Sequence, residues 1–413
     1  MNLKKSAAYI LVFFASVMLI SGCYDGEEPD SLAFVVAIGV DKAEEEREGY
    51  KITFQFANPS QISGGASEEG GKTGKESIKN ITVTAPGIYS AVNQANHMVS
   101  KTFTLAHTKL VVFSEEIAKE GVDNFLETVG RSSDIRPNTY FAVSKCSAGE
   151  FLEAVDPETE VNPVRYYTMI FENNQSGFVP KNMSQEFYLY HDSEEKSCIM
   201  PLCDKASGEN TNEYSDTGYQ YKMGNFEAGK APTGGDKGTQ VMGMAVFDDD
   251  RIISEMKEIE TEIYNILTGE YRLGYVTYYY DKSPDIPITL IQTQKRLPKI
   301  RVDTSGSRPK ISVELYMEAD FCSSTLEVSL ENDLQSFTEQ IKRELKEQTE
   351  QFLKETQRLN TDIVGFGSYA KREFLNEKSF SDYKWREKYA DAEFDVKIHY
   401  SIRRMGLLIR SGK

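Results

Sequence analysis

The N-terminal segment limits what this chain can fold into, because it has to be set apart before a folded body can be sought. Lys4 and Lys5 give a basic start, and Ala7 to Ile20 form an apolar run without a charge. The small pair Ser21-Gly22 follows, and then Cys23. The run is too short to span a bilayer comfortably and is typical of a secretory signal. We therefore assign residues 1–22 to a signal peptide.

The residues Leu19-Ile20-Ser21-Gly22-Cys23 resemble the lipobox of bacterial lipoproteins. The resemblance implies that Cys23 carries diacylglycerol and becomes the first mature residue. An ordinary cleaved signal and a short uncleaved anchor stay open as alternatives. Residues 23–31 are polar and, as a flexible tether, span roughly 15–20 Å. Because two acyl chains attach a protein stably where one is reversible, we expect an exported protein held close to the outer face of a membrane.

The composition indicates a folded, acidic body. The formal net charge is −17, and 39% of the residues are hydrophobic. This apolar content supports sizeable cores and argues against a wholly disordered chain. The negative charge argues against nucleic-acid binding and against unaided adsorption to anionic lipids. No second apolar run approaches transmembrane length.

Four cysteines follow the lipobox: Cys146, Cys198, Cys203 and Cys322. Only Cys198 and Cys203 are close in sequence, and export permits a disulfide between them. A zinc site needs a tighter knuckle and a second pair, which are missing. The spacing favours structural cysteines, free or singly paired, over a metal site.

Hydrophobic periodicity predicts an α+β fold with mixed or antiparallel sheets flanked by helices. The predicted strands are Leu32–Val40, its hairpin partner Tyr50–Ala57, Ile78–Ala85, Thr108–Ser114, Tyr140–Lys145, Gln240–Phe247, Arg272–Tyr280, Lys310–Phe321 and Phe394–Ser401. The predicted helices are Ile88–Lys101, Glu115–Glu120 capped by Ser114, Val122–Gly130, Ala148–Val155, Ser254–Leu267 and Asn332–Leu359 capped by Asn332-Asp333.

The domain organisation is predicted from changes in composition. Residues 204–238 are rich in Gly, Asn, Thr and charge and poor in large aliphatic residues, which is typical of a linker or excursion. We expect two to three lobes: an N-terminal α+β domain at 32–203, a middle lobe at 239–290 and a C-terminal α+β domain at 291–413.

Motifs for catalysis, cofactors and metals are missing. Gly71-Lys72-Thr73 lacks the glycine that a phosphate-binding loop requires, and Asp248-Asp249-Asp250 lacks the spacing and glycine of a calcium loop. The four histidines do not form a metal-ligand pattern, and there is no G-x-S-x-G elbow. Tyr275 and Tyr278-Tyr279-Tyr280 fit strand packing better than a ligand-stacking surface. The sequence therefore predicts no catalytic residue, no cofactor and no metal.

Five blocks in order resemble the Ger(x)C family of spore germination lipoproteins. The first is Gly22-Cys23-Tyr24-Asp25, where the family usually has Trp in place of Tyr24. Leu32 to Asp41 (LAFVVAIGVD), Ala106 to Gly121 (AHTKLVVFSEEIAKEG) and Val241 to Asp250 follow. The last block joins Asp362 to Gly367 (DIVGFG), Trp385 and Arg403 to Gly406. Each block is weak alone, and the ordered set is specific.

This resemblance implies a three-domain α+β subunit of a nutrient germinant receptor on the outer face of the spore's inner membrane. Its implied partners are an A-type and a B-type membrane subunit, and the family has no known catalytic residues. The candidate interaction surfaces are the block with His107, Glu115 and Glu116, and the turn with Asp362, Gly365 and Gly367. A purely structural role for both stays open, since tight turns demand glycine.

Two rival functions are considered. A solute-binding lipoprotein of a transport system is disfavoured because regular βαβ units are missing from the predicted pattern. A secreted cell-wall enzyme is the other alternative, and loss of a phenotype on mutating a single buried acid, with folding intact, would favour it.

Overall fold

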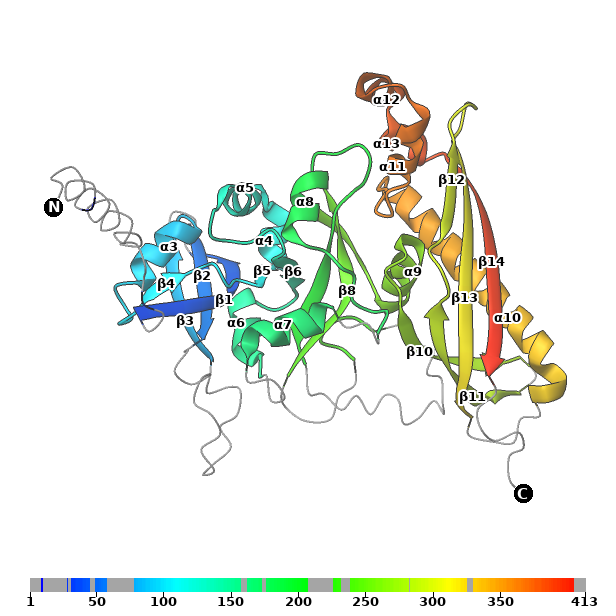
Figure 1. Cartoon of the computed structure of the whole chain (residues 1–413), viewed down its shortest axis with the longest axis horizontal. Coiled ribbons are helices and arrows are strands. Elements are labelled where there is room, and N and C mark those ends of the chain that lie inside the picture. The colour runs from blue at the N-terminus through cyan, green and yellow to red at the C-terminus, as the bar shows by residue number, and fades with distance from the viewer. Residues whose placement is uncertain are drawn as a thin grey trace.

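The computed structural model describes residues 31–44, 49–57, 78–156, 162–172, 176–206, 226–231, 238–281, 283–324 and 330–404, with Tyr9 and Glu28. The described part contains two sheets with helices packed on them, arranged one after the other along the long axis of the molecule (Figure 1). The predicted α+β class is confirmed. The signal peptide apart from Tyr9, Cys23, and most of the linker predicted at 204–238 lie outside these residues.

The first sheet has nine strands in the order β3-β2-β1-β5-β6-β7-β8-β9, with β4 also paired to β1. The predicted β1–β2 hairpin is present, and β1, β5, β6 and β7 run parallel at the centre. The central strands are buried on both faces, which explains their unbroken apolar runs. The strands are β1 (Leu32–Lys42), β2 (Tyr50–Ala57), β3 (Ile78–Ala85), β4 (Thr102–Thr104), β5 (Leu110–Ser114), β6 (Tyr140–Ser144), β7 (Ile199–Lys205), β8 (Thr239–Asp248) and β9 (Arg251–Met256).

Short amphipathic helices cover both faces of this sheet. Four of them contribute side chains to one core: α3 (Ile88–Ala95), α4 (Glu115–Glu120), α5 (Asp123–Arg131) and α8 (Ser184–Tyr190). Two others form a second core on the opposite face: α6 (Ala148–Ala154) and α7 (Pro163–Phe171). Buried Asp41 at the end of β1 accepts hydrogen bonds from the backbone N–H groups of Ala148 and Gly149, at 2.6 and 2.9 Å, and so fixes α6 to the sheet.

The second sheet has five strands and is covered by one long helix, α10 (Leu330–Arg358). Its strands are β10 (Leu273–Tyr280), β11 (Ser283–Gln294), β12 (Lys299–Asp303), β13 (Lys310–Ser324) and β14 (Glu393–Arg404). β13 pairs in antiparallel fashion with β11 and β12 on one side and in parallel with β14 on the other. Short helices between α10 and β14 complete the lobe: α11 (Phe366–Ala370), a 3-10 turn (Lys371–Glu373), α12 (Glu377–Tyr383) and α13 (Trp385–Tyr389).

The two sheets share one hydrophobic core. Ile199, Met244 and Val246 of the first sheet belong to the same cluster as the inner face of the second sheet and α10. Helix α9 (Glu258–Thr268) contributes to this cluster and joins the sheets. The segment 239–290, expected as a separate middle lobe, is divided: β8 and β9 complete the first sheet, and β10 and β11 belong to the second.

Two predicted helix starts are wrong. The helix predicted from Ser254 starts too early, because Asp249 adopts φ 53°, the chain turns back on β8, and Arg251–Met256 form strand β9. Helix α9 begins at Glu258, where the Glu260 carboxylate accepts the N–H of Lys257 at 2.8 Å. Helix α10 begins at Leu330, so the predicted cap at Asn332 lies inside it.

The remaining difference in helix length lies in α3. The helix ends at Ala95 instead of reaching Lys101, and Asn96 accepts the N–H of Phe103 through its side chain at 2.8 Å. Asn side chains compete for backbone groups in this way and end helices.

The tyrosines of β10 are divided between its two faces. Tyr278 and Tyr280 are buried in the shared core, as the strand-packing interpretation requires, whereas Tyr275 is 52% exposed.

Candidate functional site

The junction between the two sheets contains the best-defined polar cluster in the described residues, and it includes the predicted turn at Asp362. Helices α11 to α13 project from the second lobe beside β12 (Figure 1). The segment 193–197 of the first lobe lies against them, since the N–H of Ser197 donates to the backbone carbonyl of Asp362 at 2.8 Å. The turn is therefore a contact between lobes.

The Asp362 carboxylate organises this turn. It is buried and accepts four N–H groups: those of Gly365 at 2.8 Å, Phe366 at 3.0 Å and Gly367 at 2.7 Å, and the indole N–H of Trp385 at 2.9 Å. Burial raises the pKa of Asp362 to about 6, although the four donors act in the opposite direction. At neutral pH Asp362 is therefore ionised, and all four N–H groups donate to its carboxylate. The role of Asp362 is structural.

Gly365 and Gly367 are required here for different reasons. Gly365 has φ 87°, in the left-handed region that glycine adopts without strain. A Cβ on Gly367 would lie 2.7 Å from Nε1 of Trp385 and still closer to the carbonyl oxygen of Glu195. Gly367 thus permits the close approach of the two lobes, and neither glycine presents an open surface.

Ion pairs surround this contact. Lys371 binds Glu195 at 2.6 Å, and Arg386 binds Asp248 at 3.0 Å and Asp249 at 3.4 Å. The acidic triplet that resembles a calcium loop in sequence is therefore partly paired with an arginine from the other lobe. Glu195 and Arg386 were not predicted, because nothing in the local sequence connects residues so far apart.

His107 lies at the edge of the first sheet from which β5 starts. It is exposed and packs edge-on against Phe34, with ring centroids 4.8 Å apart. Partial burial lowers the pKa of His107, and the nearby cations Arg136 and Lys109 lower it further. The imidazole is therefore neutral at physiological pH.

Glu115 and Glu116 lie at the other end of β5, so the structure does not bring them together with His107. Lys145 binds Glu115 at 3.0 Å and Glu255 at 2.5 Å, and thereby joins α4, β6 and β9. Burial raises the pKa of Glu115, but hydrogen bonds from Lys119 and Lys145 outweigh this effect and hold the pKa below its ordinary value. Glu116 is exposed and lies 3.6 Å from the Lys42 ammonium.

The β8–β9 hairpin connects two of the predicted surfaces. Its Asp250 carbonyl accepts the N–H of Val122, just after α4, at 3.0 Å, while Asp248 and Asp249 bind Arg386. Helices α4 and α13 thus both contact this hairpin, and α13 also carries Trp385, which donates to the Asp362 carboxylate.

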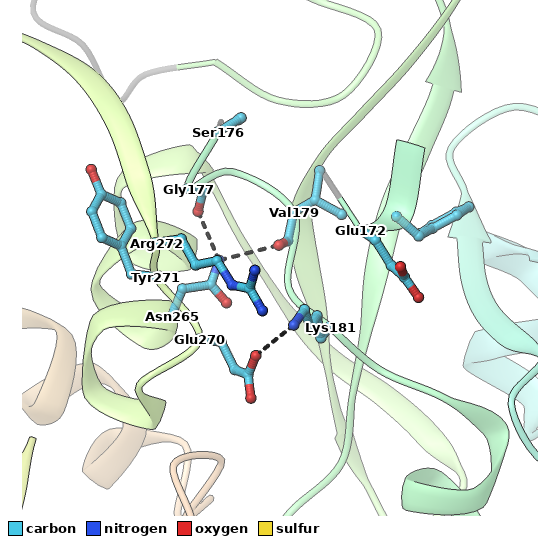
Figure 2. A pocket seen from close by; sticks show the side chains of 10 residues that line it. Glu172, Ser176, Gly177, Val179, Lys181, Asn265, Glu270, Tyr271 and Arg272 are labelled. Carbon is cyan, nitrogen blue, oxygen red and sulfur yellow. Dashed lines mark hydrogen bonds and ion pairs between the residues drawn. The ribbon is translucent and has the colours of Figure 1, made fainter. Parts of the chain in front are cut away.

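A second contact between the lobes is shown in Figure 2. The amide of Asn265, on α9, donates to the carbonyls of Gly177 at 2.8 Å and Val179 at 3.2 Å, and Lys181 binds Glu270 at 2.8 Å. The space between these groups is about 10 Å³, which is room for about one water molecule. This pocket therefore fastens the lobes together and is too small for a nutrient molecule.

The described residues contain no cluster of three metal-ligating side chains and no helix long and apolar enough to cross a membrane. The four later cysteines are free thiols. Cys198 and Cys203 lie in cores on opposite faces of the first sheet, so the disulfide considered from their spacing is wrong for this structure. Burial raises the pKa of the Cys198 thiol to about 12, so it is unreactive.

Comparison with known proteins accounts for nearly the whole chain. Residues 25–205 match the family described as Spore germination protein N-terminal domain, and residues 242–406 match the family described as Spore germination B3/ GerAC like, C-terminal. The chain belongs to the Ger(x)C family. The family resemblance of the sequence blocks is thereby confirmed.

Its relatives include full-length spore germination proteins. Spore germination protein KC of Bacillus subtilis (strain 168) is 25% identical over 96% of this chain and 95% of its own length. Spore germination protein GerQC of Bacillus cereus is 20% identical over 97% of this chain and 99% of its own. The crystal structure of the GerBC protein superimposes with a TM-score of 0.52 at 14% identity, covering 89% of this chain and 98% of that one. That similarity supports the fold.

Proposed function

We propose that this protein is a membrane-anchored, non-catalytic subunit of a nutrient germinant receptor, which acts by docking to membrane subunits during nutrient-triggered spore germination. The observation that carries the proposal is the similarity to named spore germination proteins along almost the entire chain. In this proposal Cys23 bears the lipid anchor on the outer face of the spore's inner membrane, and the partners are an A-type and a B-type receptor subunit.

The junction between the two lobes supports docking over capture of a ligand between them. Its two lobes are fastened by a shared core and by the Asp362 turn, and the pocket between them holds about one water molecule. A solute-binding protein of the kind considered above would need an internal site that closes around its ligand. The docking surfaces therefore lie on the outside of a rigid body.

The test is nutrient-triggered germination in spores whose other receptors are removed. We compare the normal gene, a deletion, Cys23→Ala, and Cys322→Ala as a matched loss of an exposed free cysteine. Germination is followed after nutrients and after a stimulus that bypasses nutrient receptors. The expected result is loss of the nutrient response in the deletion and Cys23→Ala spores, with the bypass response and the Cys322→Ala spores unaffected.

Two outcomes would count against the proposal. A deletion that still responds to every nutrient removes the receptor role and favours the solute-binding alternative. A deletion that fails while Cys23→Ala responds normally keeps the receptor role and removes the anchor.

A further inference from the structure

One stretch of this acidic protein is free of acidic side chains. The whole chain has 64 Asp and Glu residues against 47 Lys and Arg, yet Ile78 to Ser114 contains neither Asp nor Glu. The same stretch carries Lys79, Lys101 and Lys109. Its charge is therefore opposite to that of the protein as a whole.

The topology gathers these cations at one edge of the first sheet. Strands β1, β4, β5 and β6 are parallel. β2 is antiparallel to β1, and β3 is antiparallel to β2, so β3 runs in the same direction as β1. The N-terminal ends of all five strands thus lie at the same edge. Lys79 is the second residue of β3, Lys101 immediately precedes β4, Lys109 immediately precedes β5, and Arg136 lies in the turn before β6. We call Lys79, Lys101, Lys109 and Arg136 the basic edge.

The basic edge is not neutralised by the described part of the protein. None of its four cations has an ion pair with a described residue, whereas Lys145, Lys371 and Arg386 all do. Arg136 and Lys79 are exposed and the other two are half-buried. The acidic side chain nearest in sequence is the exposed Asp134. Unpaired, accessible cations are the groups that an anionic surface attracts.

The N-terminal tether leaves the fold at this same edge. β1 begins at Leu32, which pairs with Thr102 at the start of β4. A tether of eight or nine residues spans roughly 15–20 Å, so an anchor at its other end keeps the basic edge next to the membrane. Each cation held near an anionic membrane surface strengthens binding by roughly fivefold.

We propose that the basic edge binds anionic phospholipid headgroups and so sets the orientation of the anchored protein, with the N-terminal ends of β3 to β6 facing the membrane. The inference deepens the proposed anchoring and rests on it. The acidic tether residues Asp25, Glu27, Glu28 and Asp30 are the competing occupant of the edge, and the experiment separates the two.

The experiment measures backbone hydrogen exchange in the full chain on vesicles. One set is phosphatidylcholine alone, and the other contains about a quarter phosphatidylglycerol. The reporters are peptides covering residues 96–109 and 134–140, and peptides from the other end of the same strands, 115–121 and 144–149, are the internal reference. We expect slower exchange only at the basic edge, only on the anionic vesicles, and loss of this protection at about 0.5 M salt, where charges are screened within a few ångströms.

Charge-matched variants test the cause. Reversal of the basic edge (K79E, K101E, K109E and R136E together) is expected to abolish the protection and leave the protein attached. The control reverses four exposed cations of the second lobe that have no ion pair with a described residue, Arg301, Arg308, Lys354 and Lys378, and should keep the protection.

The outcomes separate this inference from the proposed anchor. If the protein attaches to both vesicle types and the basic edge exchanges equally fast on both, headgroup binding by the basic edge is wrong and the proposed anchor stands. If the basic edge is protected on anionic vesicles but the protein does not stay attached to neutral ones, the proposed anchor is wrong and the headgroup binding stands. If the protein neither stays attached nor shows protection, both proposals are wrong. Protection that is present without vesicles, and that disappears when the four tether acids are changed to Asn and Gln, assigns the edge to the tether and overturns the lipid proposal.

Discussion

The buried carboxyl of Glu262 makes the stability of this protein depend on pH in a direction that can be worked out. Glu262 lies on α9, between the two sheets, and its neighbour Gln292 donates to it at 3.4 Å. Burial raises the pKa of Glu262 from 4.5 to about 7, although the neighbouring Tyr271 acts in the opposite direction. Because the folded-state pKa is the higher one, the stabilisation by this group is complete below pH 4.5 and is lost as the pH rises through 7.

The substitution Glu262→Gln removes this dependence. A shift of about 2.5 pKa units corresponds to about 3 kcal/mol between the two protonation states. Gln keeps the size and the acceptor oxygen and is neutral at every pH. We therefore expect Glu262→Gln to equal the parent protein near pH 4.5 and to exceed its unfolding free energy by up to about 3 kcal/mol at pH 8.

The assay is denaturant unfolding at several pH values, followed by the fluorescence of Trp385, the single tryptophan of the chain. The control is Glu347→Gln, which removes an exposed carboxylate on α10 and should leave the pH profile unchanged. The difference between Glu262→Gln and the parent is the quantity of interest, because other titrating groups cancel in it. A difference that is flat from pH 4.5 to 8, or a loss of stability at pH 8, would refute the reasoning.

Four further substitutions test the junction and the first lobe. Gly367→Ala should destabilise the protein by about 1–3 kcal/mol through overpacking against Trp385, and Gly365→Ala by about 1–2 kcal/mol through left-handed backbone strain; equal, negligible effects in denaturant unfolding would contradict both. Trp385→Phe removes a hydrogen bond to a buried carboxylate and should cost at least about 2 kcal/mol by calorimetry, whereas an unchanged melting temperature would mean that Asp362 does not need this donor. Lys145→Ala leaves two partly buried carboxylates without their shared cation, so a loss of about 1 kcal/mol is expected, and a double-mutant cycle with Glu115→Ala should show coupling.

The sequence predicts the elements whose pattern is unbroken, and proline accounts for two of the strands that it misses. β1, β5 and β6 were placed to within about two residues, because strands buried on both faces read as continuous apolar runs. β7 and β11 were missed because Pro201, Pro284 and Pro287 argue against strands in the sequence. In β7 the ladder shifts register next to Pro201, which is how a strand accommodates a residue without an N–H group.

The candidate surfaces show a similar division. The Asp362 turn was found from its sequence pattern, because a carboxylate followed by two closely spaced glycines is a local feature. Its partners Glu195 and Lys196 are more than 150 positions away, so no local pattern could show that the turn is buried between lobes rather than exposed. His107 and Glu115 are close in sequence, yet a strand separates them and places them at opposite edges of the sheet.

The rigidity of the junction bears on how a subunit of this kind communicates. Moving one sheet against the other would expose Ile199 and Met244, which costs several kcal/mol by the magnitudes used above. It would also break the hydrogen bond from the N–H of Ser197 to the backbone carbonyl of Asp362. A partner that binds the outer end of the second sheet requires no such rearrangement. Because the two lobes move as one rigid body, a displacement of the second lobe also moves the basic edge of the first. If both proposals hold, a partner that engages the second lobe therefore acts on the orientation of the whole subunit at the membrane. Substitutions at Gly367 that loosen the junction should then impair germination even when the anchor and both outer surfaces are unchanged.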